Sequence, residues 1–367
     1  GNNWIKWTNG FPTVPVKDLL IHTRESDLVI GTFGRAAWII DDIEPLRTVA
    51  KNNKVLFDTI KLFSPPTSYK ASFQQPTGSR FGGDALYHGT NRSRGSRLSF
   101  YFNANYKPKN DSITNWDSLY MKIYDNQKLI RTLKKKVPEK SGIDYFYWYM
   151  DEKGIQWPSK KIKKSNYEPF GVRVLPGKFK VVLEYGNLKS EQIIEVKNDP
   201  RIELDSEKEK EIYKTLKQLE SYQKITSKIT RQLAQSKEIA INHQELLDKF
   251  NNEKFKENLE ITKKTINEID ILFELIFGKE DERQGITAEP SSNLLLRLSS
   301  AQQYVSSRQN GMTQTEKILI KQLKKDLKNI IIKVNNFFNQ DWIKFKSSTE
   351  AVDLSPFKEI EFFEIKE

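Results

Sequence analysis

The chain of 367 residues has no cysteine and only three histidines, His22, His88 and His243. Without cysteine there is no disulfide, no thiol nucleophile and no cysteine-ligated metal site. The histidines lie far apart in the sequence, so a histidine-rich metal site would require all three to converge. Composition therefore disfavours most catalytic classes, and we expect neither a cofactor nor a metal.

Long hydrophobic runs are also missing. No apolar run approaches the ~18–20 residues of a membrane span, and no basic-then-apolar signal segment opens the chain. The first residue is Gly1 rather than methionine, which is typical of a fragment left after a tag is cleaved. We therefore expect no membrane span in this segment, and any targeting signal to lie upstream of it.

Acidic residues are too few to balance the basic ones, and the net charge is +12. Residues 1–200 hold 32 basic and 20 acidic residues, whereas residues 201–367 hold 28 of each. The basic clusters are short and lie in stretches that contain Pro, Gly or Ser: Lys134–Lys136, and Lys160, Lys161, Lys163 and Lys164. These stretches predict solvated loops rather than a phosphate-binding patch, so no nucleic-acid partner is expected.

The spacing of apolar and turn residues predicts a multidomain β + α protein with domains at residues 1–63, 64–200 and 201–367. In the first, short apolar runs split by Gly, Asn and Asp predict an antiparallel meander followed by a short helix. In the second, strands with turn signals between them predict a β-sandwich. The expected strands are 16–22, 28–31, 36–41, 97–103, 118–125, 128–133, 144–150, 177–185 and 191–196, and the expected short helix is 44–53.

The third domain has apolar residues every three to four positions and almost no Gly or Pro, which predicts an all-α helical bundle. The first helix begins near a capping box formed by Ser206 and Glu209 and carries Ile225 or Thr226 on its apolar face. A second helix runs from about Leu246 to Gly278, a third spans 293–308, and a fourth runs from about Thr313 through Trp342. Residues 355–367 could be a strand or an arm. We expect residues 206–347 to fold without the β domains.

The first domain carries the most specific motif, which extends from Trp7 to Leu46. It includes Asn9-Gly10, His22, Gly31-Thr32, Gly34-Arg35, Trp38 and Asp41-Asp42. This segment resembles the closing blade of the sortilin-type, BNR-like β-propellers of large bacterial envelope proteins. The resemblance covers about 45 residues. It implies that the chain is extracytoplasmic and that its partner is an upstream propeller of the same full-length protein.

The second domain resembles the Ig-like sandwich that follows these propellers and recurs in flagellar hook-capping proteins. Its segments Met121–Leu133, Gly142–Trp148 and Pro176–Arg201 match the family's strand pattern. The segment Gly89–Gly95 departs from it, because the family has a Pro-rich turn there. The third domain matches the family's helical region in position and pattern only.

Three groups of residues invite functional interpretations, each with a structural alternative that we favour. The run Tyr145–Tyr149 could stack sugars or bases, but one face of a strand here is expected in the core and the other under a neighbouring domain. Asp41 and Asp42 resemble a glycosidase pair, but adjacent residues point apart and predict turn or cap positions. His22 with Arg24 and Arg35 could line a pocket, but a strand-end histidine bonded to backbone carbonyls is favoured.

We therefore expect a non-catalytic structural or interaction module that supports the propeller and binds a protein or a glycan. The alternative is an accessory region of a glycosidase or sialidase-like enzyme whose catalytic residues lie upstream. No catalytic residue is assigned, and we expect no hydrolase activity from this segment alone. Without the rest of the propeller, the blade could pair with a second copy through an exposed edge or dock on the sandwich of its own chain. Docking is favoured, and it would bury the apolar side chains of the blade, namely Val16, Leu20, Val29, Trp38 and Ile40.

Overall fold

The computed structural model describes residues 4, 6–71, 93–106, 116–162, 167–250, 253–279 and 293–352. The chain forms two compact units. Unit 1 consists of Gly1–Gly154 and Asn166–Tyr213, and unit 2 of Ile155–Ser165 and Lys214–Glu367. Unit 1 contains all the described strands and unit 2 most of the helical residues, so the predicted mixed β + α content is confirmed.

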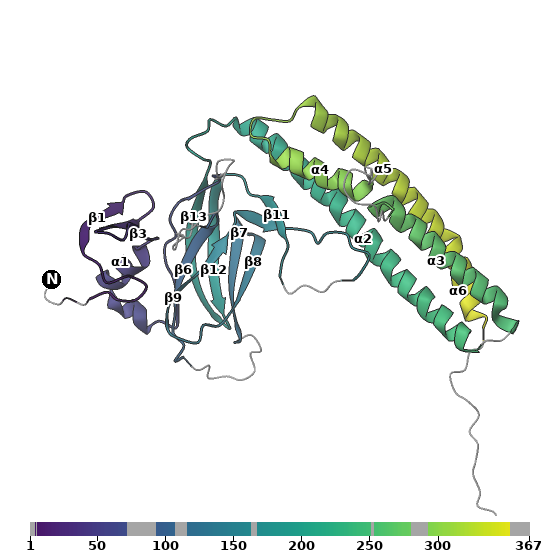
Figure 1. Ribbon diagram of the computed structural model, residues 1–367, viewed down its shortest axis with the longest axis horizontal. Coiled ribbons are helices and arrows are strands. Elements are labelled where there is room, and N and C mark those ends of the chain that lie inside the picture. The colour runs from purple at the N-terminus through teal and green to yellow at the C-terminus, as the bar shows by residue number, and fades with distance from the viewer. Residues whose placement is uncertain are drawn as a thin grey trace, which may run out of the picture. The chain divides into compact units, whose positions relative to one another are not determined.

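The first sheet of unit 1 is a three-stranded antiparallel meander in the order β1-β2-β3 (Figure 1). Its strands are β1 (Val16–His22), β2 (Asp27–Thr32) and β3 (Ala37–Ile40). The helix α1 (Glu44–Lys51) and the 3-10 helix η1 (Asn53–Phe57) follow. These elements agree with the predicted strands and short helix, because Gly, Asp and Ser in the intervening turns interrupt each apolar run.

The remaining strands of unit 1 form three sheets. A five-stranded sheet has the order β5-β13-β12-β7-β8, a three-stranded sheet has the order β4-β6-β9, and β10 pairs with β11. The strands are β4 (Ile60–Leu62), β5 (Ser68–Tyr69), β6 (Ser96–Phe102), β7 (Ser118–Asp125), β8 (Lys128–Lys136), β9 (Gly142–Trp148), β10 (Asp151–Lys153), β11 (Phe170–Arg173), β12 (Gly177–Tyr185) and β13 (Leu188–Lys197). All pairs are antiparallel except β5 with β13.

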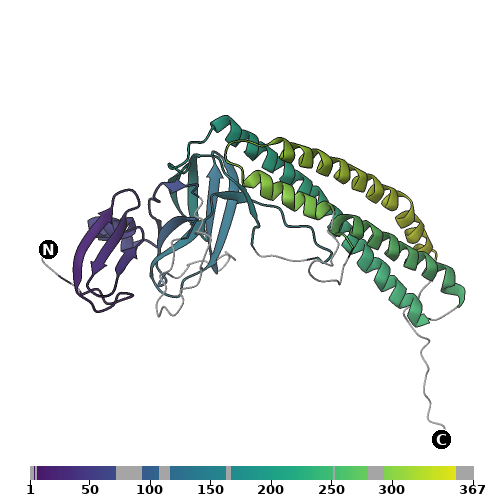
Figure 2. The same cartoon turned by 45° about the horizontal axis from the view of Figure 1, so that its top comes forward.

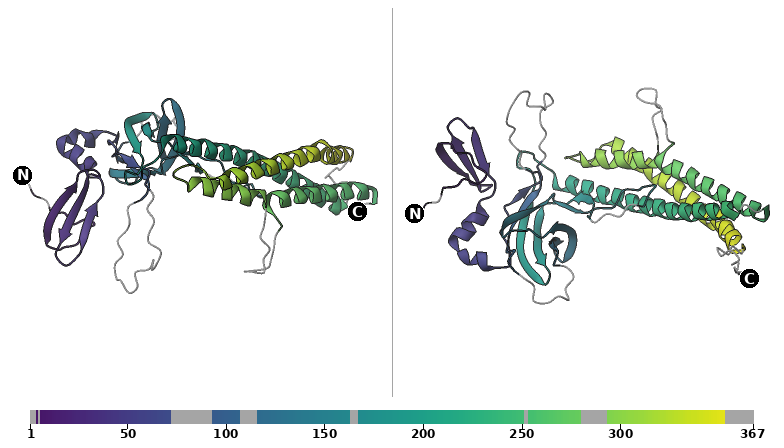
Figure 3. Two further views of the ribbon diagram at one scale, coloured as in Figure 1. Left: turned by 90° about the horizontal axis from the view of Figure 1, so that it is seen from above. Right: turned by 60° about the horizontal axis from the view of Figure 1, so that its bottom comes forward.

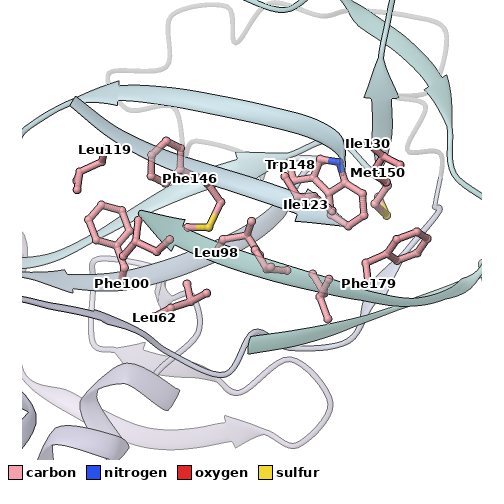
Figure 4. Packing of buried hydrophobic residues seen from close by; sticks show 14 of the residues in the cluster. Leu62, Leu98, Phe100, Leu119, Ile123, Ile130, Phe146, Trp148, Met150 and Phe179 are labelled. Carbon is pink, nitrogen blue, oxygen red and sulfur yellow. The ribbon is translucent and has the colours of Figure 1, made fainter. Parts of the chain in front are cut away.

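One hydrophobic core joins the five-stranded sheet and the three-stranded sheet β4-β6-β9 (Figure 4). Alternate residues of each strand enter it, as period-two patterning requires. On β9, Phe146 and Trp148 face the core, and the Trp148 ring packs against Phe179 of β12 at a centroid distance of 5.4 Å. Large aromatic side chains from facing sheets therefore supply much of the buried area that stabilises unit 1.

Several strands differ from their predicted bounds; β13, for example, begins at Leu188 rather than at 191. β8 continues through Lys134–Lys136, which were predicted to be a loop, because Ser118 and Leu119 of β7 still pair with Lys136 and Lys135. β9 ends at Trp148 rather than at 150, because Met150 adopts a left-handed backbone conformation with φ of 55° that breaks the ladder. Lys163 and Lys164 lie outside the described residues.

The helices of unit 2 lie side by side (Figures 2 and 3). The structure has α2 (Ser206–Phe250, whose first residues belong to unit 1), η2 (Glu253–Phe255), α3 (Lys256–Phe277), α4 (Leu294–Ser306), α5 (Gln314–Asn339) and α6 (Asp341–Glu350). α3 contacts α4, α5 and α6, and α5 contacts α4 and α6. Each long helix buries an apolar stripe, with Leu219, Ile269, Leu298 and Leu323 almost fully inaccessible.

The helix bounds correct several predictions. Leu246 belongs to α2 rather than to the second predicted helix, because no Gly or Pro interrupts the run before residue 251. The fourth predicted helix ends at Asn339, and Trp342 lies in the separate helix α6. Thr226, not Ile225, faces the helical core. Residues 355–367 lie outside the described part.

The start of α2 also differs from the predicted capping box. The Asp205 carboxylate accepts hydrogen bonds from the backbone N–H groups of Glu207 and Lys208 at 2.9 and 3.3 Å. Glu209 instead forms a salt bridge with Lys70 at 2.6 Å. Asp205 is therefore the capping side chain, because its position directly before the first helical residue lets it reach the free amides.

Candidate interaction surface

The residues considered as a pocket around His22 do not converge. His22 ends β1 at one end of the meander, whereas Arg35 lies in the loop between β2 and β3 at the other. The His22 Nδ1 accepts a hydrogen bond from the Glu25 backbone N–H at 3.3 Å, rather than bonding to the predicted carbonyls. Arg24 pairs with Glu25 at 2.7 Å. These contacts give His22 and Arg24 a structural role in the turn.

The aromatic run of β9 divides its side chains between two faces. Tyr145 and Tyr149 are partly exposed on the side opposite the core. The Arg97 guanidinium lies over the Tyr145 ring, 4.5 Å from the ring centroid. The rings of Tyr145 and Tyr147 have centroids 5.0 Å apart, and those of Tyr149 and Phe170 have centroids 5.6 Å apart. These rings already stack against groups of their own chain, which leaves few flat faces for a sugar or a base.

Asp41 and Asp42 join the meander to the three-stranded sheet. The Arg97 side chain of β6 donates to the Asp41 carbonyl oxygen at 2.9 Å. The Ser99 hydroxyl donates to the Asp42 carboxylate at 3.3 Å, and the Asp42 N–H donates to the Asp27 carboxylate at 2.9 Å. The backbone of Asp41 and the carboxylate of Asp42 therefore belong to a structural joint, and Asp42 also accepts a hydrogen bond from the Glu44 N–H at 3.3 Å, as a turn or cap residue would.

Burial at this joint raises the pKa of Asp42 above its ordinary value, because desolvation outweighs the attraction of Arg97 and the hydrogen bonds it accepts. The backbone there is left-handed, with φ of 50°. Among residues with side chains, Asn and Asp adopt this conformation most readily. Asparagine is thus the matched replacement at this position.

Asp42→Asn is expected to change how stability depends on pH. A carboxyl whose pKa is higher in the folded state binds more protons when folded, so its contribution to stability falls as the pH rises from below the ordinary pKa through the raised one. The free energy of unfolding of the parent relative to Asp42→Asn should therefore be larger at pH 4 than at pH 7. Urea titrations at both pH values measure it, and an equal or reversed difference would contradict the assigned environment.

A buried ion pair next to the core was not predicted from the sequence. Arg131 of β8 and Asp151 of β10 are almost fully buried, with 3.6 Å between guanidinium and carboxylate. Arg131 also donates to the Pro169 carbonyl oxygen, and the Gly171 N–H donates to Asp151 at 3.2 Å. Burial raises the pKa of Asp151 despite the nearby guanidinium. The pair fixes β10 and β11 against β8, and both of its charged groups are buried.

The meander β1–β3 exposes apolar side chains on both of its faces. Register places Leu20, Val29 and Ile39 on one face. Leu20 and Ile39 are 61% and 60% exposed, and Val29 between them is half-buried. Cross-strand neighbours of this kind stabilise a sheet when they are covered together. This face therefore presents a row of three apolar side chains, of which the described residues leave the outer two exposed.

The opposite face of the meander is covered in part. It carries Ile30 and Trp38, and the Trp38 ring packs edge-on against Phe11 at 5.5 Å. Leu19 and Ile21 on the same face stay exposed. Sheets with water on one side normally alternate apolar and polar residues, whereas strands buried on both faces are apolar throughout. In the meander, successive apolar residues such as Leu19, Leu20 and Ile21 put apolar side chains on both faces, yet these three remain exposed.

The predicted docking of the meander on the sandwich is therefore wrong for two of its named side chains. Val16 and Leu20 are exposed, and Val29, Trp38 and Ile40 are only half-buried. Polar contacts to β6 follow the end of β3 instead, where Arg97 donates to the Asp41 carbonyl oxygen and Ser99 to the Asp42 carboxylate. The joint uses one corner of the sheet and leaves apolar side chains exposed on both faces, among them Leu19, Leu20 and Ile39.

Within the described ranges, no three His, Asp or Glu side chains gather in a way that could hold a metal ion. The described helices include none with the length and apolar content needed to cross a bilayer.

No protein-family model and no curated protein matches the chain. Among solved structures, a chain titled pT26-6p aligns with 80% of this chain at 11% identity and a TM-score of 0.13. The aligned part spans about half of that structure, 49% of its length. A similarity at this level indicates neither a fold nor a function.

Proposed function

We propose that this chain is a non-catalytic interaction module of a bacterial envelope protein, whose meander β1–β3 packs against a β-propeller that precedes it in the full-length chain. The observation that carries the proposal is the sheet with exposed apolar side chains on both faces. Such a surface is unusual on an isolated soluble domain and typically marks an interaction site. A blade inside a propeller is covered by a neighbouring blade on each side, which matches this pattern.

The edges of the meander support the same interpretation. Within the described residues, β1 and β3 each pair only with β2, so each leaves one backbone edge open. Propeller blades are typically four-stranded. The three strands seen here thus lack one strand of a blade, and a strand from the preceding propeller could complete the sheet by ordinary backbone hydrogen bonding.

In this proposal the other elements support the blade. The two sheets of unit 1 that share a core would form the Ig-like sandwich, and the joint at Asp41, Asp42 and Arg97 would hold the blade at a fixed angle to it. The helices of unit 2 would form the helical bundle. An extracytoplasmic location follows from the resemblance to envelope proteins and is part of the proposal.

A protein partner is favoured over a glycan for unit 1. Sugar binding on aromatic side chains needs free ring faces, and the Tyr145 ring is covered by Arg97 and contacted by Tyr147. The meander presents aliphatic side chains instead, which suit packing against another sheet. Each large apolar side chain that becomes fully buried contributes roughly 1.5–3 kcal/mol, so a few suffice to hold a blade in place.

The double variant Leu20→Asp/Ile39→Asp tests this function by comparing two chains. In the 367-residue chain both side chains are exposed, so the variant should leave its thermal unfolding almost unchanged. In the full-length protein, where the proposal buries both positions, the same variant should lower the unfolding temperature of the propeller clearly. Calorimetry measures both.

The matched control is Ile193→Asp on β13, because Ile193 is as exposed as Leu20 and lies outside the meander. It should be neutral in both chains. An equal effect of the double variant in the two chains would contradict the proposal. Concentration-dependent dimerisation of the 367-residue chain that the double variant abolishes would show that a second copy, not the propeller, covers the face.

A further inference from the structure

Unit 2 contains a cavity of about 210 Å³ between the segment 155–162 and α2. Its walls come from Trp157, Lys161 and Ile162 on the segment and from Ser227, Thr230 and Arg231 on the helix. This volume lies below the roughly 300–1,000 Å³ of pockets for drug-sized molecules. The cavity therefore suits a ligand with a single ring.

The segment that forms one wall is held on the helices at several points. The Gln223 side-chain amide donates to the Ile155 carbonyl oxygen at 2.7 Å and in turn accepts from Gln302 at 2.9 Å. Pro158 is buried, and the Lys160 ammonium lies 5.8 Å from the centre of the Phe277 ring. The wall is thus positioned in advance of any ligand, which reduces the entropy cost of binding.

Two cations and an indole converge on this cavity. Lys161 and Arg231 are exposed, and neither forms an ion pair or a side-chain hydrogen bond with any residue that the structure describes. In a second cavity of unit 2, by contrast, Arg297 is paired with Asp326. Unpaired cations facing one cavity favour an anionic group there, since a guanidinium binds a carboxylate or phosphate in a bidentate manner.

The rest of the lining indicates a hydroxylated ring. Trp157 is 45% exposed and offers a flat apolar face, while Ser159 and Ser227 supply hydroxyl groups and Gln156 an amide. An apolar face combined with a few polar groups orients a ligand that has both characters. A purely apolar acid would offer no acceptor to the hydroxyl protons of Ser159 and Ser227, so it should bind less tightly than a hydroxylated one.

We propose that this cavity binds a single-ring sugar acid, with its acidic group between Lys161 and Arg231 and its ring against Trp157. The acidic group can be a carboxylate or a phosphate, since both bind these cations. The site lies outside the surface assigned to the propeller and goes beyond the proposed function.

The test uses the 367-residue chain and isothermal titration with four probes: D-glucuronate, D-glucose 6-phosphate, D-glucose and benzoate. At least one of the two sugar acids should bind, and their relative affinities identify the acidic group. Glucose and benzoate should each bind at least about tenfold more weakly than the better sugar acid, because each loses one set of contacts. Equal binding of benzoate or glucose, or no binding of either sugar acid, would overturn the proposal.

Variants tie the binding to these residues. Arg231→Gln and Trp157→Ala should each lower the affinity for the sugar acid by about tenfold. Arg231→Lys keeps the charge and should lower the affinity less than Arg231→Gln does. The control Lys324→Gln removes one positive charge from an exposed position on α5 and should leave the affinity unchanged. Because Arg231 and Trp157 are exposed, their replacement should not unfold unit 2, which circular dichroism checks. Binding that Arg231→Gln and Lys324→Gln weaken equally would reflect net charge only and contradict the site.

Discussion

Trp148→Ala is expected to destabilise unit 1 by roughly 3–5 kcal/mol, the usual cost of deleting a buried aromatic side chain. Trp148 is fully buried, its indole N–H donates to the Asp151 carbonyl oxygen at 2.9 Å, and its ring packs against Phe179. Alanine would leave a cavity between the two sheets and an unpaired carbonyl oxygen. The peptide from β6, which pairs with β9, should then open at a correspondingly lower free energy.

Hydrogen–deuterium exchange with mass spectrometry measures this opening peptide by peptide, which separates unit 1 from unit 2. The control is Trp4→Ala, because Trp4 is almost fully exposed and its loss should not change exchange in β6. Unchanged protection of β6 in Trp148→Ala would show that the core does not lie where the two sheets place it.

Leu323→Ala is expected to destabilise unit 2 by roughly 2–5 kcal/mol, the range for a buried leucine. Leu323 lies on the buried stripe of α5 with Leu327 and Ile330, and α5 contacts α3, α4 and α6. The cavity would therefore weaken contacts with several helices together. Thermal unfolding followed by far-ultraviolet circular dichroism reports it, since helices dominate that signal.

Ile332→Ala on the same helix is the matched control, because Ile332 faces solvent. It removes a similar volume and should cost little. A loss near zero for Leu323→Ala, or equal losses for both variants, would contradict the assigned packing of α5.

Local pattern was sufficient to predict most elements of the fold. The three strands of the meander, the pairing core strands and the helical character after residue 206 follow from period-two and period-3.6 repeats with clear turn residues. One error arises where strand pairing overrides local preference, and another where a helix continues through residues assigned to the next helix. Lys134–Lys136 extend β8 because β7 continues beside them, and α2 runs on past Leu246 because nothing in the sequence ends it.

The candidate surfaces were harder to predict than the elements. The pair Arg131 and Asp151 is separated by 20 residues, and only the sheet arrangement brings the two together. The cavity near Trp157 is formed by a segment and a helix about 70 residues apart in the sequence. The apolar character of the meander could be read from the sequence, but its exposure could not, because exposure depends on which residues pack over it.

Hydroxyl-radical footprinting of Leu20 and Ile39 tests the central claim, that the meander is an interface with a preceding propeller, most directly. The two side chains are compared in the 367-residue chain and in the full-length protein, with Ile193 as the internal reference. Rapid modification is expected in the 367-residue chain and strong protection in the full-length protein, with no change at Ile193. Equal modification of Leu20 and Ile39 in both proteins would contradict it.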